Sequence, residues 1–187
     1  MKNKNIEIEV RFINIDVKNI KKKLIKLKAK DLGEDLIKEL IFYDKNLSWR
    51  KKGIFVRIRK TNGKIYLTYK HHKEAKIDGT TEIEFEVNDL EKAKDFLLRL
   101  GLICYRQQEK KRHKFILGMV TIDIDTWPNI PTYLEIEGKT EKDIKKAAQK
   151  LDLDYSEALF IDARQIIEKK YGIPVSTYKY FTFDKIG

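Results

Sequence analysis

The amino-acid sequence predicts an α+β domain with seven or eight antiparallel strands and four helices. Three observations lead to this fold class. Several segments alternate strictly between apolar and polar residues, as half-buried strands do. Other segments carry apolar residues at helical spacing behind a residue that can cap a helix. In nearly every expected strand the charged residues share one face, so the other face is left for the helices to cover.

The N-terminal quarter of the chain begins with the clearest strand pattern. Residues 6–12 read "IEIEVRF" and place all their apolar side chains on one face. Asp16 can cap a helix, whose lysine-covered outer face spans residues 18–30. Residues 38–44 then predict a second strand, and a polar connection follows it.

A β-hairpin is expected next. The pair Asn62-Gly63 separates two alternating segments, 54–60 and 64–70, and Asn-Gly is a strong signal for a two-residue turn. Residues 80–87, "TTEIEFEV", alternate again and predict another strand.

The second half of the chain repeats the helix and strand patterns. Asp89 caps a helix that stops at Gly101. Further strands are expected at 104–117, 119–125 and 131–138, and further helices at 140–151 and 156–172.

Length and composition narrow the class of protein. The 187 residues suit one domain, expected over 1–175 with a C-terminal tail at 176–187. A single cysteine, Cys104, excludes an internal disulfide and a cysteine-based zinc site. The absence of a long apolar run predicts a cytoplasmic protein that does not bind a membrane. The net charge of +11 favours anionic partners.

The charged faces of the expected strands suggest a chemistry. If the sheet curls with its helices outside, paired carboxylates and paired cations line the same interior. Carboxylates are hard ligands for Mg²⁺ or Mn²⁺, and Arg and Lys donate hydrogen bonds to phosphate oxygens. The alternative is an open sheet, in which opposite charges pair in solvent for at most about 1 kcal/mol each.

These segments resemble the CYTH, or triphosphate tunnel metalloenzyme, superfamily. The resemblance rests on "EIEVRF", "FVRIRK", "LTYK", "EIEFEV", "EKKRHKF", "IDID" and "YLEIEG", which occur in the order found in the family. It covers residues 5 to 172, and some segments look most similar to class IV adenylate cyclases. Arg11 stands where the family signature has Lys, and the loop "TWPNIP" departs from the turn common in relatives.

The resemblance implies an eight-stranded antiparallel closed β-barrel with a polar interior and helices packed outside. It implies that the interior is a tunnel that binds a triphosphate, such as ATP, with Mg²⁺ or Mn²⁺. Family members cyclise ATP or hydrolyse inorganic, nucleoside, thiamine or RNA triphosphates. The similarity to class IV enzymes favours cyclisation of ATP to cyclic AMP and pyrophosphate, with triphosphate hydrolysis as the alternative.

The resemblance also implies residue roles. The expected metal ligands are Glu7, Glu9, Glu84, Asp125, Glu135 and Glu137, with Asp123 and Glu82 on the same strand faces. The expected phosphate ligands are Arg11, Arg57, Arg59, Lys70, Lys110 and Arg112. The expected catalytic residues are Glu7, Glu9, Lys70 and Lys110.

Two questions stay open at the level of sequence. A module that binds polyphosphate or nucleic acid without turnover would share this basic composition, but rows of carboxylates on the binding face would repel phosphate unless a metal intervenes. Nucleic acid is not the expected partner. Trp127 either packs in the core or stacks on a nucleotide base. The sequence does not fix the oligomeric state, and a homodimer is one expectation.

Overall fold

The computed structural model describes residues 6–73 and 80–187, with the backbone alone for Ile6 and Glu7. The strands are β1 (Ile6–Glu7), β2 (Glu9–Phe12), β3 (Lys30–Asp44), β4 (Ile54–Thr61), β5 (Lys64–His72), β6 (Thr80–Val87), β7 (Leu102–Leu117), β8 (Val120–Thr126), β9 (Tyr133–Gly138) and β10 (Tyr180–Phe181). The helices are α1 (Val17–Lys26), α2 (Ser48–Lys51), α3 (Leu90–Arg99), α4 (Glu141–Lys150) and α5 (Ala163–Tyr171). Two 3₁₀ helices, η1 (Tyr155–Glu157) and η2 (Val175–Thr177), lie on either side of α5.

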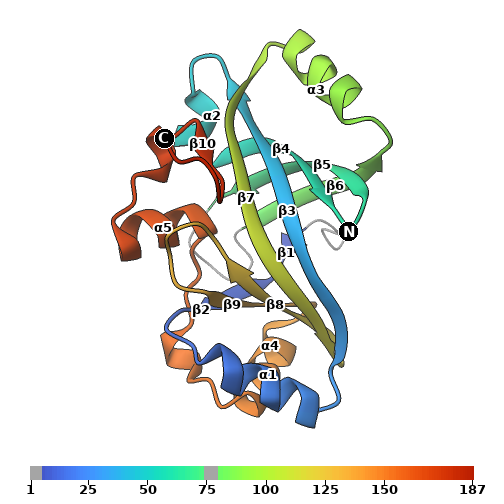
Figure 1. Ribbon diagram of the computed structural model, residues 1–187, viewed down its shortest axis with the longest axis vertical. Helices are drawn as coiled ribbons and strands as arrows, with labels where there is room; N and C mark the ends of the chain where they lie inside the picture. Colours follow the sequence, from blue (N-terminus) through green and yellow to red (C-terminus); the bar gives the residue numbers. More distant parts are fainter. Residues whose placement is uncertain (1–5, 74–79) are drawn as a thin grey trace.

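The described strands form one curled sheet. Its order is β1-β6-β5-β4-β3-β7-β8-β9-β2, every pair on this path is antiparallel, and β10 pairs in parallel with β7. The long strands β3 and β7 cross the whole molecule and join its two halves (Figure 1). Such long, twisted strands bend the sheet into a half-barrel with a concave face.

The expected barrel is not closed in this structure. The two ends of the sheet, β1 and β2, are consecutive in the chain and separated by Ile8 alone. However, β1 pairs with β6 over only two residues, Ile6 with Thr81 and Glu7 with Thr80. Because β1 and β6 pair over so few residues, strand pairing does not run continuously around the cavity that the sheet encloses.

The apolar faces of most strands lie outside, under helices, as the sequence predicts, whereas Ile83 and Phe85 of β6 are exposed. Val10 on β2 and Ile136 on β9 pack with Leu24 of α1 and Ile144 of α4 in one buried cluster. At the other end of the molecule, α3 places Leu97 in a second cluster. The convex face therefore supplies the hydrophobic stabilisation, and the concave face is left to the charged residues.

Several boundaries differ from the expected ones. β3 begins at Lys30 rather than at residue 38, because Gly33 (φ +84°) sits at an irregularity that the strand accommodates. The expected polar connection contains the short helix α2. The hairpin between β4 and β5 is confirmed, with Asn62 and Gly63 both at positive φ.

The last helix differs most. It begins at Ala163 instead of residue 156, because Asp162 caps it by accepting a hydrogen bond from the Gln165 amide at 2.7 Å. Unlike α1, α3 and α4, it covers part of the concave face. Its Ile166 and Ile167 pack with Tyr133, which shares a strand face with Glu135.

The C-terminal segment is folded onto this end of the sheet. β10 runs beside β7, with Phe181 opposite Gln108. Phe181 is completely buried and packs with Trp127. The segment 176–187, which the sequence predicts as a tail, therefore packs against the sheet at this end.

Candidate functional site

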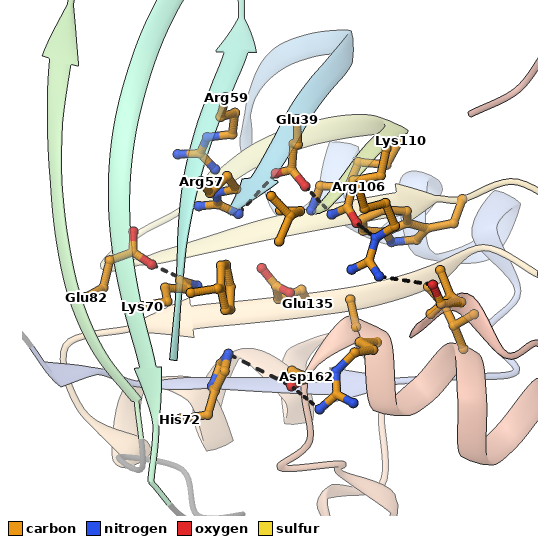
Figure 2. Close-up of a pocket in the computed structure, with 18 of the residues that line it drawn as sticks. Glu39, Arg57, Arg59, Lys70, His72, Glu82, Arg106, Lys110, Glu135 and Asp162 are labelled. Carbon is orange, nitrogen blue, oxygen red and sulfur yellow. Dashed lines mark hydrogen bonds and ion pairs between the residues drawn. The ribbon is translucent and has the colours of Figure 1, made fainter. Parts of the chain in front are cut away.

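A cavity of about 260 Å³ occupies the concave face of the sheet (Figure 2). Among the described residues, ten Lys or Arg and seven Asp or Glu line this central cavity, so positive charge is in excess by three. The cations are Arg11, Arg50, Arg57, Arg59, Lys70, Arg106, Lys110, Arg112, Lys114 and Arg164; the carboxylates are Glu9, Glu39, Glu82, Glu84, Glu135, Glu137 and Asp162. A cavity with this balance attracts an anion.

Strands β2 and β9 form one side of the cavity. The Arg11 guanidinium lies between two carboxylates, with Nη2 2.6 Å from Glu9 Oε1 and 2.8 Å from Glu135 Oε2. Burial opposes the charged form of Glu135, but Arg11 and Arg112 outweigh it and hold the pKa of Glu135 well below its ordinary value. Arg11 and Glu135 are therefore both held in their ionised forms.

Strands β7 and β8 hold a denser cluster. Arg112 makes a bidentate pair with Asp125 at 2.6 Å for both bonds, and it also contacts Asp123 and Glu135. Lys110 Nζ lies 2.7 Å from Asp125. Asp125 is completely buried behind these two cations and does not line the cavity. Asp125 is therefore placed to orient the side chains of Lys110 and Arg112.

Strands β4, β5 and β6 form the opposite wall, where the ion pairs are more open. Arg59 Nη2 lies 2.8 and 2.7 Å from the two oxygens of Glu84, and Lys70 Nζ lies 2.7 Å from Glu82. Figure 2 shows Arg59, Lys70 and Glu82 around the cavity. The side chain of Glu84 is 24% exposed, so this carboxylate can change partner at less cost than a fully buried one.

Of the described charged residues that line the cavity, six were not among the predicted site residues, namely Glu39, Arg50, Arg106, Lys114, Asp162 and Arg164, and two of these six are buried. Glu39 of β3 accepts hydrogen bonds from Arg57 at 3.0 Å and from Gln108 at 2.6 Å. Burial favours the neutral acid, but Arg57 and Lys110 outweigh it and lower the pKa of Glu39 to about 2. Glu39 therefore carries a full charge near the middle of the cavity.

Arg106 is the second of these buried residues. It is only 5% exposed. Its Nη1 donates to the Val175 carbonyl at 3.0 Å and its Nε to Gln108 Oε1 at 2.8 Å, but no carboxylate of the described residues forms an ion pair with it. A buried guanidinium without a counter-charge is costly unless a ligand supplies that charge. Arg106 therefore points to an anionic ligand.

Orphaned donors support the same conclusion. Within residues 6–73 and 80–187, the Nε atoms of Arg11 and Arg59 are buried and have no hydrogen-bond acceptor. Buried donors normally find a partner, and phosphate oxygens are acceptors that Arg binds well.

The carboxylates on β2 and β9 fit a divalent metal ion. Glu9 lies directly opposite Glu137 in the strand register, where like charges destabilise a sheet, and Arg11 at 2.6 Å from Glu9 offsets part of this repulsion. No group of three or more Asp, Glu, His or Cys with the arrangement of a metal site occurs among the described residues. Mg²⁺ commonly uses only one or two carboxylates and takes its other ligands from phosphates and water. The two facing carboxylates therefore suit a metal that arrives with a phosphate ligand.

Trp127 packs in the core. Phe181 stacks on its ring with 6.2 Å between centroids, and Lys110 Nζ lies 5.3 Å from the ring centroid. Its Nε1 donates to the Tyr133 hydroxyl at 2.9 Å. Trp127 lines the cavity but is only 4% exposed, so little of its ring is open to a nucleotide base.

The structure brings most of the predicted site residues together. The predicted residues that line the central cavity are Glu9, Arg11, Arg57, Arg59, Lys70, Glu84, Lys110, Arg112, Glu135 and Glu137. Asp125 lies behind the cavity wall, and the side chain of Glu7 lies outside the described residues. Glu82 lines the cavity, whereas Asp123 is buried with Asp125.

Comparison with known proteins identifies the family. The model of the CYTH domain matches residues 5–169. The chain belongs to the CYTH domain family. Over 170 residues it is 29% identical to a candidate adenylate cyclase of Methanocaldococcus jannaschii, with 89% of this chain and 96% of that protein aligned.

Solved structures share the fold of this CYTH chain. A protein from Pyrococcus horikoshii has a TM-score of 0.70 at 29% identity, covering 83% of this chain and 96% of that one. A candidate adenylate cyclase from Vibrio parahaemolyticus has a TM-score of 0.73 at 14% identity, covering 88% and 98%. A Hippeastrum protein, described as a candidate adenylyl cyclase with a dominant triphosphatase activity, has a TM-score of 0.62 at 16% identity, covering 91% and 98%.

Proposed function

We propose that this CYTH chain binds a triphosphate together with Mg²⁺ or Mn²⁺ in the central cavity and cleaves one of its P–O–P bonds. The observation that carries the proposal is the excess of cations among the residues that line the cavity, above all the buried Arg106, with which no carboxylate of the described residues forms an ion pair. The orphaned Nε donors of Arg11 and Arg59 supply further sites for phosphate oxygens.

The ion pairs within the cavity suggest that ligand binding depends on a metal ion. In the free protein Arg59 and Lys70 pair with Glu84 and Glu82. A bare triphosphate would take these cations from Glu84 and Glu82 and leave two partly buried carboxylates without a counter-charge, which is costly. A divalent ion bound together with the phosphates would supply the positive charge that offsets these carboxylates, so the charge of the cavity would stay balanced. We therefore expect binding to depend on the metal.

Glu9 and Glu137 are the proposed metal ligands, because they face each other across β2 and β9. A divalent ion held there would neutralise phosphate charge and lower the pKa of a bound water. We leave Asp125 out of this set because Lys110 and Arg112 occupy its oxygens. Its proposed role is to position those two cations.

The cations would stabilise the leaving group. In hydrolysis, water attacks the terminal phosphorus, the bridging P–O bond breaks and a diphosphate leaves. Arg57 and Arg59 on β4, with Arg106 and Lys110 on β7, surround the cavity from two sides and can neutralise charge that develops on the outer oxygens. Burial and the neighbouring Arg112 lower the pKa of Lys110, which makes its ammonium a better proton donor to the departing oxygen.

We favour hydrolysis over cyclisation. Trp127 and the aromatic residues packed with it lie in the core, so their rings offer adenine little surface on which to stack. Cyclisation is the second candidate, because the M. jannaschii relative is named as a candidate adenylate cyclase. In that reaction the ribose 3′-hydroxyl attacks the α-phosphorus and pyrophosphate leaves.

We also propose that the sheet forms a closed tunnel around the bound ligand. The support is that residues 6–12 pair with β6 at one end and with β9 at the other. A ligand that contacts both walls would favour this closure.

One experiment separates the two reactions. The protein is incubated with inorganic triphosphate and, separately, with ATP, each with Mg²⁺ or Mn²⁺, and the products are identified by chromatography. Orthophosphate with a diphosphate is the expected result. Cyclic AMP with pyrophosphate from ATP would instead establish the cyclase. If neither substrate is cleaved at acidic, neutral or alkaline pH, the proposed enzyme function is wrong.

A further inference from the structure

A second cavity, of about 360 Å³, adjoins the central cavity at the end of β5. The two cavities adjoin, because their walls share Glu9, Arg11, Arg50, Gly53, His72, Asp162 and Arg164. We call this second cavity the vestibule. His72 and Asp162, which line both cavities, lie close together at one side of the central cavity in Figure 2. A ligand held in the central cavity can therefore extend into the vestibule without leaving the protein.

The vestibule is strongly cationic. Beyond the shared residues it adds Lys51, Lys52 and Lys73, all exposed, and no carboxylate of the described residues forms an ion pair with them. Its only acidic lining residues among those described are Glu9 and Asp162, both at the border. Positive potential in a concave space concentrates anions.

The fold holds these lysines over the opening. Gly53 follows α2 at φ +71°, and its carbonyl accepts a hydrogen bond from the His72 amide at 2.9 Å. A Cβ at Gly53 would lie 2.4 Å from the His72 carbonyl oxygen, so only glycine allows this close approach. Arg50 of α2 is anchored by the Tyr105 hydroxyl at 3.0 Å. The position of Lys51 and Lys52 beside the end of β5 is therefore built into the backbone.

The lining favours phosphate over a nucleobase. Phe160 is the one aromatic ring, besides His72, among the described lining residues, and it packs in the core with an edge-on contact to Tyr155 at 6.3 Å. Bases bind exposed aromatic faces, whereas a row of flexible lysines suits repeated phosphates without a base.

We propose that the vestibule binds the phosphates beyond the third in a linear inorganic polyphosphate. This inference rests on the proposed function, because the first three phosphates would occupy the central cavity. It makes chain length a determinant of affinity: a tetraphosphate or longer chain gains contacts with Lys51 and Lys52 that a triphosphate lacks.

The test compares inorganic triphosphate, tetraphosphate and a longer linear polyphosphate by calorimetry, with Ca²⁺ as counter-ion and products checked by chromatography. The variants are the double substitution Lys51→Ala/Lys52→Ala and a matched control, Lys22→Ala/Lys26→Ala, which removes two exposed lysines of α1. We expect the wild type and the control to bind tetraphosphate about fivefold or more tightly than triphosphate, since each exposed ion pair contributes up to about 1 kcal/mol. The vestibule variant should lose this difference and keep its affinity for triphosphate.

Equal affinities for the three chain lengths in the wild type would overturn the proposal. So would an equal loss in both double variants, which would indicate diffuse attraction to a basic surface. A 5′-triphosphorylated oligonucleotide is tested in parallel; if it alone gains affinity through Lys51 and Lys52, the occupant is nucleic acid and the assignment is wrong. Chain-length dependence without any cleavage would overturn the proposed function while leaving the vestibule assignment standing.

Discussion

The buried cations of the cavity differ in what holds them. Arg57 is paired with the buried Glu39, and Arg112 with Asp125, so these two arginines complete internal ion pairs. Arg106 is held by the Val175 carbonyl and Gln108 instead. Removing either kind of cation therefore has different consequences for stability and for binding.

Substituting Arg106→Met should weaken triphosphate binding with a smaller loss of stability than Arg57→Met. A lost charged hydrogen bond costs roughly 1.5–3 kcal/mol of binding, or about 10- to 100-fold in Kd. Arg57→Met should in addition destabilise the fold by about 3–5 kcal/mol, because Glu39 would remain buried with its main counter-charge removed. Calorimetry and urea unfolding of both variants measure these effects. Unchanged Kd in Arg106→Met would argue against its role in anion binding.

His72 gives the cavity a pH dependence. Burial, with a further contribution from Lys70, lowers the pKa of His72 to about 4 from its ordinary value of 6.5, although Asp162 opposes the shift. Between these two values the unfolded chain binds more protons than the folded one, so stability falls as pH drops from 6.5 towards 4.

His72→Gln should therefore lose less unfolding free energy over that pH range than the wild type. The control is His71→Gln, because His71 precedes it on β5 and does not line the central cavity. Urea unfolding at several pH values compares the three proteins. Identical slopes in the wild type and His72→Gln would refute the assignment.

The sequence predicts the site residues that lie on cleanly alternating strands and misses those on strands that do not alternate. Glu9, Arg11 and Glu135 stand out because the opposite faces of their strands are apolar. Glu39 is flanked on its own face by Ile37 and Ile41, both buried, so strand periodicity does not mark it as a site residue. A lone charge within an otherwise apolar strand is the signal that could have revealed it.

At the site, β7 has a neighbouring strand from a distant part of the chain, and the local sequence does not specify this arrangement. β8 pairs with β7 from Lys111 onward, and β10 replaces it as the neighbour of β7 at Gln107 and Gln108. The C-terminal segment therefore supports the stretch of β7 that carries Arg106 and Lys110. We propose that it belongs to the same domain as residues 1–175.

Phe181→Ala tests this role of the C-terminal segment. Truncating a completely buried Phe typically costs about 3–5 kcal/mol, and here it also removes the ring that stacks on Trp127 below Lys110. We expect a lower free energy of unfolding, altered tryptophan fluorescence and weaker triphosphate binding. Phe183→Ala, at a position that is 42% exposed, is the matched control and should change stability much less. Similar behaviour of both variants would contradict the proposed role.

Caps and turns explain which elements the sequence predicts well. Asp16, Asp89 and Thr140 each cap the helix expected after them, and Asn62-Gly63 forms the expected turn, because these signals act over a few residues. The start of α5 is also set by a local cap, Asp162, which the expected helix from residue 156 passes over. The pairing of β10 with β7 joins distant parts of the chain and leaves no short-range signal, so the sequence leaves it unassigned.

The two faces of the sheet have different roles in the whole molecule. The convex face packs under α1, α3 and α4, and the concave face holds the charged cavity. No described helix has the length and apolar character needed to cross a lipid bilayer. Because the core lies outside the cavity, most of the hydrophobic stabilisation survives changes to charged residues of the wall.

The central claim is that the cavity cleaves a triphosphate with the help of a divalent metal. Its most direct test is the initial rate of orthophosphate release from inorganic triphosphate across a Mg²⁺ or Mn²⁺ titration, for the wild type and Glu9→Gln. The account predicts a wild-type rate that rises with metal and disappears with a chelator. It predicts a loss of about a hundredfold in Glu9→Gln, with an unchanged circular dichroism spectrum, because the amide keeps the shape of the side chain and removes its charge. A rate that is independent of metal, or a Glu9→Gln variant as active as the wild type, would contradict it.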